Sequence, residues 1–184
     1  MKINTKKLIL LSIFSLLILT GLTSIYVYIS QPKRSGLIKI SGLKDKVIVH
    51  FDKYGRPHVF ANNTHDLVFT HGYLVAQDRL FQLDITRRAA KGELSEILGK
   101  KGLLRDKFVR DIGLIDIAKN ELKNSSKQSI KILNYYSKGI NAYIEKYRHE
   151  LPIEFRVLNY KPKPWKPIDS ILIVKQIAEV TDTS

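Results

Sequence analysis

The chain has 184 residues, of which 44% are hydrophobic and 26% are charged, so it is long enough and apolar enough to fold around a core. Its 31 Lys and Arg residues outnumber 17 Asp and Glu residues, and the resulting net charge of +14 suits anionic partners. Cysteine is absent, which excludes a disulfide framework, a thiolate metal site and a cysteine nucleophile. No nucleic-acid-reading motif accompanies the basic residues, so we expect a solvated basic surface and no nucleic-acid partner.

The N-terminus carries a membrane signal. Leu8 to Ile29 is an uncharged apolar run of the length that crosses a bilayer as a helix, and lysines precede it. Leu19 and Leu22 lie where a signal peptidase needs small residues, so the sequence favours an uncleaved anchor over a cleaved signal peptide. We therefore expect a membrane-anchored protein whose folded part lies outside the cytoplasm, on the periplasmic or extracellular face.

Three segments follow from this pattern. We assign residues 1–30 to the anchor or signal, residues 31–46 to a linker that contains Pro32 and Gly36, and residues 47–184 to a folded domain. No internal repeat interrupts the last segment.

A β-hairpin opens the folded domain. Apolar residues alternate from Val47 to Phe51, the turn-rich stretch Asp52 to Pro57 follows, and His58 to Ala61 resumes an extended pattern. In this hairpin His50 would face His58 with Asp52 nearby, which is the outline of a metal or acid–base site. A third ligand at a fixed spacing is missing, and we predict ordinary surface residues and no metal site.

Helices dominate the remainder, so the predicted fold class is α+β and mainly helical. Apolar residues recur at three- and four-residue steps, which is typical of amphipathic helices. We predict a long helix from Asn63-Thr64 to near Gly92, a turn over 94–98, a helix over 112–122, a helix capped at Ser125 that ends before Pro152, and a last helix from Pro167 through Ala178.

Charged residues lie among apolar neighbours in the long helix, at Asp78-Arg79 and at Arg87-Arg88. A charge near a core must be paired, so these residues predict a buried ion-pair network, and the alternative is a substrate-binding arginine. If Asp78 were paired in the core, its replacement by Ala would cost about 3–5 kcal/mol.

Five motifs in order resemble the penicillin acylase family. They are similar to the family's opening hairpin, to its strongest α-chain motif and to three later segments, and they lie at 49–61, 72–83, 87–96, 139–143 and 164–170. The resemblance extends from Val47 to Ala178, so residues 47–184 look like a partial α-chain domain.

The resemblance implies an N-terminal-nucleophile hydrolase that cleaves an acyl group from an amine, as in penicillin, an acyl-homoserine lactone or a related N-acyl amide. In such enzymes a precursor is cut into α and β chains, and the N-terminal Ser of the β chain attacks the amide with its own α-amine as base. The helices here would wrap the β-chain sandwich, and the resemblance places Ile177 and Thr181 in the acyl-binding pocket. The expected partners are therefore a β chain and a small N-acyl amide substrate.

The same resemblance assigns no catalytic residue and no cofactor to this chain. The catalytic Ser, the oxyanion-hole groups and the calcium-binding positions of the complete enzyme correspond to sequence after Ser184. The alternative hypotheses are a non-catalytic, membrane-anchored basic module and an inactive gene fragment.

Overall fold

The computed structural model describes residues 5–29 and 34–182, and the chain divides into two compact units, Met1–Gly36 and Leu37–Ser184. Leu37 to Lys46, which the sequence assigned to a linker, thus belongs to the second unit. Ile40 packs against the core there, and the backbone N–H groups of Lys44 and Asp45 donate to the Asp66 carboxylate at 2.9 and 2.8 Å.

The first unit contains the predicted apolar helix, α1 (Thr5–Ile29). Its stretch Lys6–Tyr26 is long and apolar enough to cross a membrane, and none of it is buried by protein. The predicted apolar helix is therefore confirmed, and its length and composition are also those of a signal sequence.

The second unit begins with the predicted hairpin. Strands β1 (Ile48–Phe51) and β2 (Pro57–Phe60) are antiparallel, and His50 lies opposite His58 as expected. The Asp52 carboxylate accepts hydrogen bonds from the backbone N–H groups of Tyr54 and Arg56, both at 2.9 Å, which closes the turn. His58 Nε2 lies 3.7 Å from Asp52, and the described residues contain no group of three side chains suited to a metal ion.

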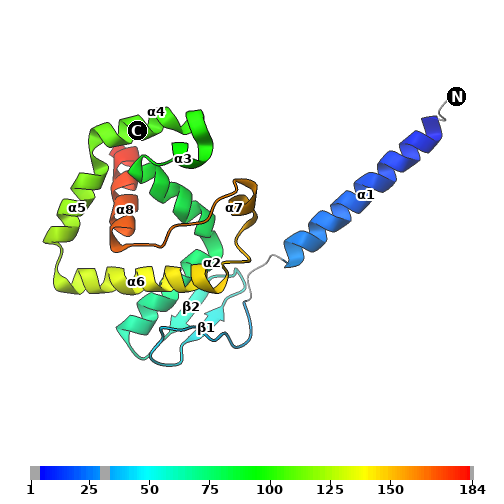
Figure 1. Cartoon of the computed structure of the whole chain (residues 1–184). Coiled ribbons are helices and arrows are strands. Elements are labelled where there is room, and N and C mark those ends of the chain that lie inside the picture. Colours follow the sequence, from blue (N-terminus) through cyan, green and yellow to red (C-terminus); the bar gives the residue numbers. More distant parts are fainter. Residues whose placement is uncertain (1–4, 30–33, 183–184) are drawn as a thin grey trace. The chain divides into compact units, whose positions relative to one another are not determined.

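Two long helices form the centre of this unit, α2 (Thr64–Lys91) and α6 (Lys127–Lys146), and they cross each other (Figure 1). Two glycines lie at their contact. A Cβ on Gly139 would clash with the carbonyl oxygen of Phe69 and lie 2.9 Å from the Tyr73 nitrogen. A Cβ on Gly72 would clash with the carbonyl oxygen of Tyr136. The two backbones therefore touch directly, which only glycine permits at these positions.

The ends of α2 follow from its sequence. Asn63 accepts a hydrogen bond from the Asp66 N–H, and Gly92 ends the helix in the left-handed conformation with φ 66°. Arg79 departs from helical geometry at φ −147° and ψ 38°, so α2 is kinked there.

Shorter helices surround this pair, and the prediction was less complete for them. They are α3 (Ser95–Leu98), the 3-10 turn η1 (Gly99–Gly102), α4 (Leu103–Ile112), α5 (Leu114–Asn124), α7 (Ile153–Val157) and α8 (Pro167–Asp182). The expected helix over 112–122 starts only after Gly113, whose φ of 74° separates it from the unpredicted α4. The predicted cap at Ser125 was wrong by one residue, because the Ser126 hydroxyl accepts the hydrogen bond from the Ser129 N–H.

The core has two parts. One lies between α2, α6 and the chain around α7, and the other joins the end of α2 to α4, α5 and α8. The first contains Tyr73, Ala76, Leu80, Ile140, Tyr143, Leu151, Phe155 and Trp165, and the second contains Ala90, Val109, Leu114, Ala118, Ile171 and Leu172. The first turns of α8 pack in the second part of the core, and its later turns carry an exposed face.

Candidate functional site

Helix α8 presents an exposed face in its second half. Val174 and Ile177 are 61% and 58% exposed, and Thr181 is exposed on the same side, because steps of three and four residues return to one helix face. The Thr181 hydroxyl donates to the backbone carbonyls of Ile177 and Ala178, at 3.0 and 2.9 Å. The two predicted substrate-binding residues, Ile177 and Thr181, are thus neighbours on one apolar face with a hydroxyl at its end.

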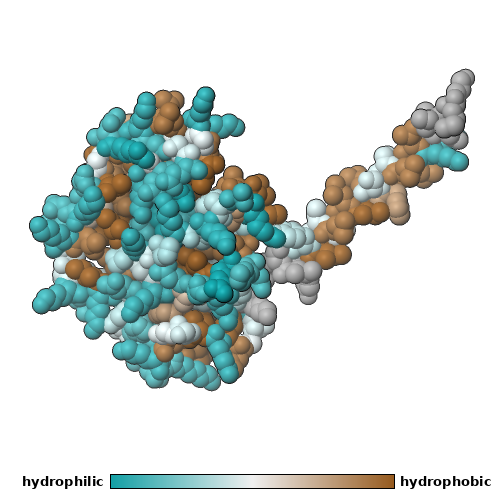
Figure 2. All heavy atoms as spheres, in the orientation of Figure 1, coloured by the Kyte–Doolittle hydropathy of each residue, from teal (hydrophilic) through white to brown (hydrophobic). Residues whose placement is uncertain are grey.

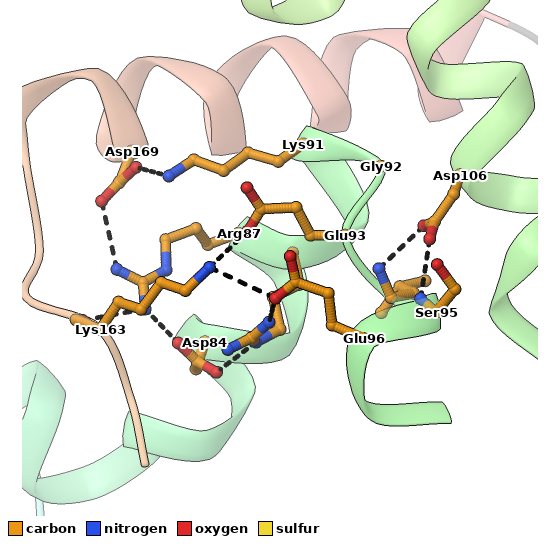
Figure 3. Close-up of polar contacts among 12 residues, drawn as sticks. Asp84, Arg87, Lys91, Gly92, Glu93, Ser95, Glu96, Asp106, Lys163 and Asp169 are labelled. Atoms are coloured by element: carbon orange, nitrogen blue, oxygen red, sulfur yellow. Dashed lines mark hydrogen bonds and ion pairs between the residues drawn. The ribbon is translucent and has the colours of Figure 1, made fainter. Parts of the chain in front are cut away.

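A buried ionic cluster fixes the start of this helix (Figure 3). Asp169 is completely buried, and its carboxylate accepts a hydrogen bond from the Lys166 N–H at 2.8 Å, which caps α8. The Arg87 guanidinium donates to the same oxygen at 3.2 Å, and the Lys91 ammonium lies 2.5 Å from the other oxygen. Two cations of α2 therefore hold the first turn of α8.

Arg87 is the centre of the cluster. It is 3% exposed, forms an ion pair with Asp84, and donates to the carbonyl oxygens of Lys163 and Pro164 at 3.0 and 3.2 Å. Its guanidinium also lies 5.1 Å from the centre of the Trp165 ring. A fork of five N–H donors can bridge two carboxylates and two carbonyls, which a lysine cannot do.

Arg88 extends the cluster toward α3. Its guanidinium donates to Asp84 at 3.0 Å and to Glu96 at 2.8 Å, and it stacks 4.9 Å from the Tyr160 ring centre. Burial alone would lower the pKa of Arg88, but the bonds to the two carboxylates raise it. The bond from Arg88 in turn holds the pKa of Glu96 below its usual value. The ion pair between Arg88 and Glu96 therefore remains charged at neutral pH.

The segment before α8 is fixed by a second set of bonds. Asn141 of α6 accepts from the Trp165 N–H at 2.7 Å and donates to the Trp165 carbonyl at 2.9 Å. The Trp165 indole N–H donates to the Ser170 hydroxyl at 3.0 Å. These bonds explain the Pro164 to Ser170 motif as a structural connection between α6 and α8.

The predicted buried network is correct for Arg87 and Arg88 but wrong for Asp78 and Arg79. Those two side chains are 55% and 54% exposed and pair with each other at 3.0 Å in solvent. The reason is the direction of the side chains along α2, since Ala76 and Leu80 turn inward while Asp78 and Arg79 turn outward. Asp84 was not predicted as a member of this network, although its spacing of three and four residues from Arg87 and Arg88 is the usual one for helical ion pairs.

His65 and Asp66 form another polar pair, with Nδ1 and the carboxylate 2.7 Å apart. Burial would raise the pKa of Asp66, but bonds from the Lys44 N–H, His65, Asn63 and the Asp45 N–H lower it well below its usual value. The carboxylate is thus used to attach residues 44–45 to the start of α2. This pair therefore has a structural role.

Comparisons with known proteins agree with this arrangement of motifs. The penicillin amidase family profile matches residues 46–184. The chain is 35% identical over 144 residues to the acyl-homoserine lactone acylase QuiP of Pseudomonas aeruginosa, covering 78% of this chain and 17% of the relative. It is 38% identical over 126 residues to penicillin G acylase of Escherichia coli, covering 66% of this chain and 15% of the relative.

A solved structure supports the same assignment. Thermostable penicillin G acylase from Alcaligenes faecalis superposes with a TM-score of 0.68 and 33% identity, covering 76% of this chain and 75% of the solved chain. The chain spans 15–20% of the length of the curated relatives it matches. This protein therefore belongs to the penicillin amidase family.

Proposed function

We propose that this chain is the N-terminal, α-chain portion of an exported penicillin-acylase-like enzyme that hydrolyses a linear N-acyl amide. The observation that carries the proposal is the family match over residues 46–184, together with the fixed position of α8. The acyl group of a penicillin, an acyl-homoserine lactone or a related amide would lie against Val174, Ile177 and Thr181.

In this proposal the catalytic Ser belongs to a β chain or a further part of the same precursor. The matched stretch fills 75% of the solved Alcaligenes faecalis chain but 15% of the Escherichia coli relative, so the solved chain is several times shorter than a curated relative. That difference is what processing of a precursor into separate chains would produce. The complete enzyme's calcium, where present, would be bound outside this chain.

The second unit also has surface suited to a partner chain. A groove beside the hairpin is lined mainly by apolar residues, and Ile48, Phe60 and Leu67 are 45%, 59% and 43% exposed. A two-stranded sheet is marginal alone and leaves strand edges unpaired. A β chain that adds strands here would cover both the edges and the groove.

The experiment isolates the tagged full chain from its native host and assays it alone and with any co-purifying polypeptide. We expect no hydrolysis of a chromogenic phenylacetyl or long-chain acyl amide by the chain alone, and hydrolysis by a complex whose second chain begins with Ser. In that complex Ile177→Arg should lower kcat/KM at least ten-fold, whereas Ile153→Arg, at a position of α7 that is 47% exposed, should change it less than two-fold. Activity of the highly purified chain alone would contradict the proposal.

We also propose that Leu8 to Ile29 anchors the chain with residues 35–184 outside the cytoplasm. The apolar helix and the lysines before it support this orientation. Protease added to intact spheroplasts should digest the second unit while a fragment that contains α1 stays with the membrane. Full protection of residues 35–184 until the cells are lysed would refute the orientation.

A further inference from the structure

Helix α4 carries an exposed apolar stripe that no described part of the chain covers. Leu104, Phe108 and Ile112 follow one another at four-residue steps and are 83%, 46% and 38% exposed. Leu98 and Leu103, which precede and follow η1 in sequence, are also exposed, at 40% and 44%. Figure 2 shows hydrophobic atoms between hydrophilic ones over α4. We call these five residues, together with Lys100, Lys101 and Lys107, the α4 surface.

The charge beside the stripe is mainly positive. Lys100 and Lys101 in η1 and Lys107 in α4 are all exposed. Asp106 lies in the same helix but turns inward, where it is 2% exposed and accepts from the backbone N–H groups of Leu94 and Ser95 at 2.8 and 2.7 Å. These bonds, with Arg110 nearby, lower its pKa although burial opposes them. The other acid of α4, Asp111, is exposed together with the three lysines, so the net charge beside the stripe is still positive.

The scaffold holds the stripe outward. Val109 is 1% exposed and belongs to the second part of the core, and Arg105 is paired with Glu179 of α8 at 2.7 Å. Arg110 donates to the Gly92 carbonyl at 3.0 and 2.6 Å. One side of α4 is thus fixed by packing and by two arginines, and its other side is exposed.

Exposed apolar side chains flanked by lysines are typical of helices that lie on a bilayer surface, where the apolar residues enter the acyl region and the ammonium groups meet lipid phosphates. A protein partner fits less well, since lysine is depleted in the centres of protein interfaces. We propose that the α4 surface binds anionic phospholipid, with Leu104 and Phe108 inserted below the headgroups and Lys100, Lys101 and Lys107 on the phosphates. The inference rests on the proposed attachment through α1, which would raise the local lipid concentration around α4.

The chain contains no cysteine, so single cysteines can carry a fluorescent probe without background. The full chain would be labelled with an environment-sensitive dye at Leu104→Cys and reconstituted into phosphatidylcholine vesicles with and without phosphatidylglycerol. We expect a blue shift and quenching by doxyl-labelled lipid only with phosphatidylglycerol, and loss of both in the variant K100E/K101E/K107E. The matched control is a dye at Lys138→Cys, an exposed position of α6, which should stay in water.

A second dye at Ile18→Cys in α1 reports insertion of the anchor separately. Quenching at position 104 without quenching at position 18 would support the α4 surface and refute the anchor. Quenching at position 18 with a probe at 104 that remains in water would refute the α4 surface alone. A dye at 104 that is shielded only after a second protein is added would also overturn the lipid assignment. Fluorescence of Trp165, the one tryptophan of the chain, verifies that every variant is folded.

Discussion

Replacement of Asp169 by Asn tests the ionic cluster at the start of α8. Asn keeps the size of the side chain and an oxygen for the Lys166 N–H, so the main change is the lost charge. Arg87 would keep Asp84, but Lys91 would lose its ion-pair partner. Breaking a buried ion pair from one side costs about 3–5 kcal/mol. Lys91 is 19% exposed and can turn partly to water, so we expect about 3 kcal/mol.

Urea unfolding of the full chain in mild detergent, followed by Trp165 fluorescence, measures this loss. Trp165 is 4% exposed and stacks on Arg87, so its emission reports the cluster directly. Asp116→Asn is the matched control, because Asp116 pairs with Lys119 in solvent with both side chains more than 60% exposed. That control should change the free energy of unfolding by less than about 0.5 kcal/mol. A loss below about 1 kcal/mol for Asp169→Asn would refute the reasoning, since the cluster would then not hold α8.

The other predictions use the same unfolding assay. Gly139→Ala should destabilise the fold by about 3 kcal/mol, because a clash with the Phe69 backbone outweighs the higher helix propensity of Ala. An unchanged urea midpoint would show that α2 and α6 can move apart at little cost. The pKa of Asp66 is lowered in the folded state, so the stabilisation from its carboxylate should be complete above its unfolded pKa of about 3.9. That stabilisation should be lost as the pH falls further. Asp66→Asn should therefore reduce the dependence of the free energy of unfolding on pH in this acid range. Asp78→Ala should cost less than about 0.5 kcal/mol, and a loss of several kcal/mol would restore the buried assignment.

Much of the helical architecture follows from local sequence signals. The apolar period and the caps define α2, and a capping serine and a long apolar face define α6. Helix α4 was missed because half of its residues are charged and glycines bound it on both sides, which hides the apolar period. Asp78 was misjudged because apolar neighbours in sequence do not show which way a helical side chain points.

Less of the candidate site could be predicted from the sequence within single helices. Ile177 and Thr181 are four residues apart, so their shared face follows from the helix period alone. The contacts that fix the helix do not, since Arg87 and Asp169 are 82 residues apart in sequence. An ion pair of that separation is determined by how α2 and α8 pack, which the spacing of residues within one element does not encode.

Because α8 is fixed at its first turn, a small tilt there produces a larger displacement at the other end of the helix. Asp169 and Thr181 are separated by about 18 Å along the helix axis, at about 1.5 Å per residue. A tilt of about 5° at the buried end would displace the exposed end by roughly 1.5 Å, which is the length of one carbon–carbon bond. Farther along the helix, the ion pairs Arg105–Glu179 and Lys175–Glu121 oppose such a tilt. A change in side-chain volume around Trp165 that tilted α8 by this angle would therefore shift its exposed face by about one carbon–carbon bond length without altering any residue on that face.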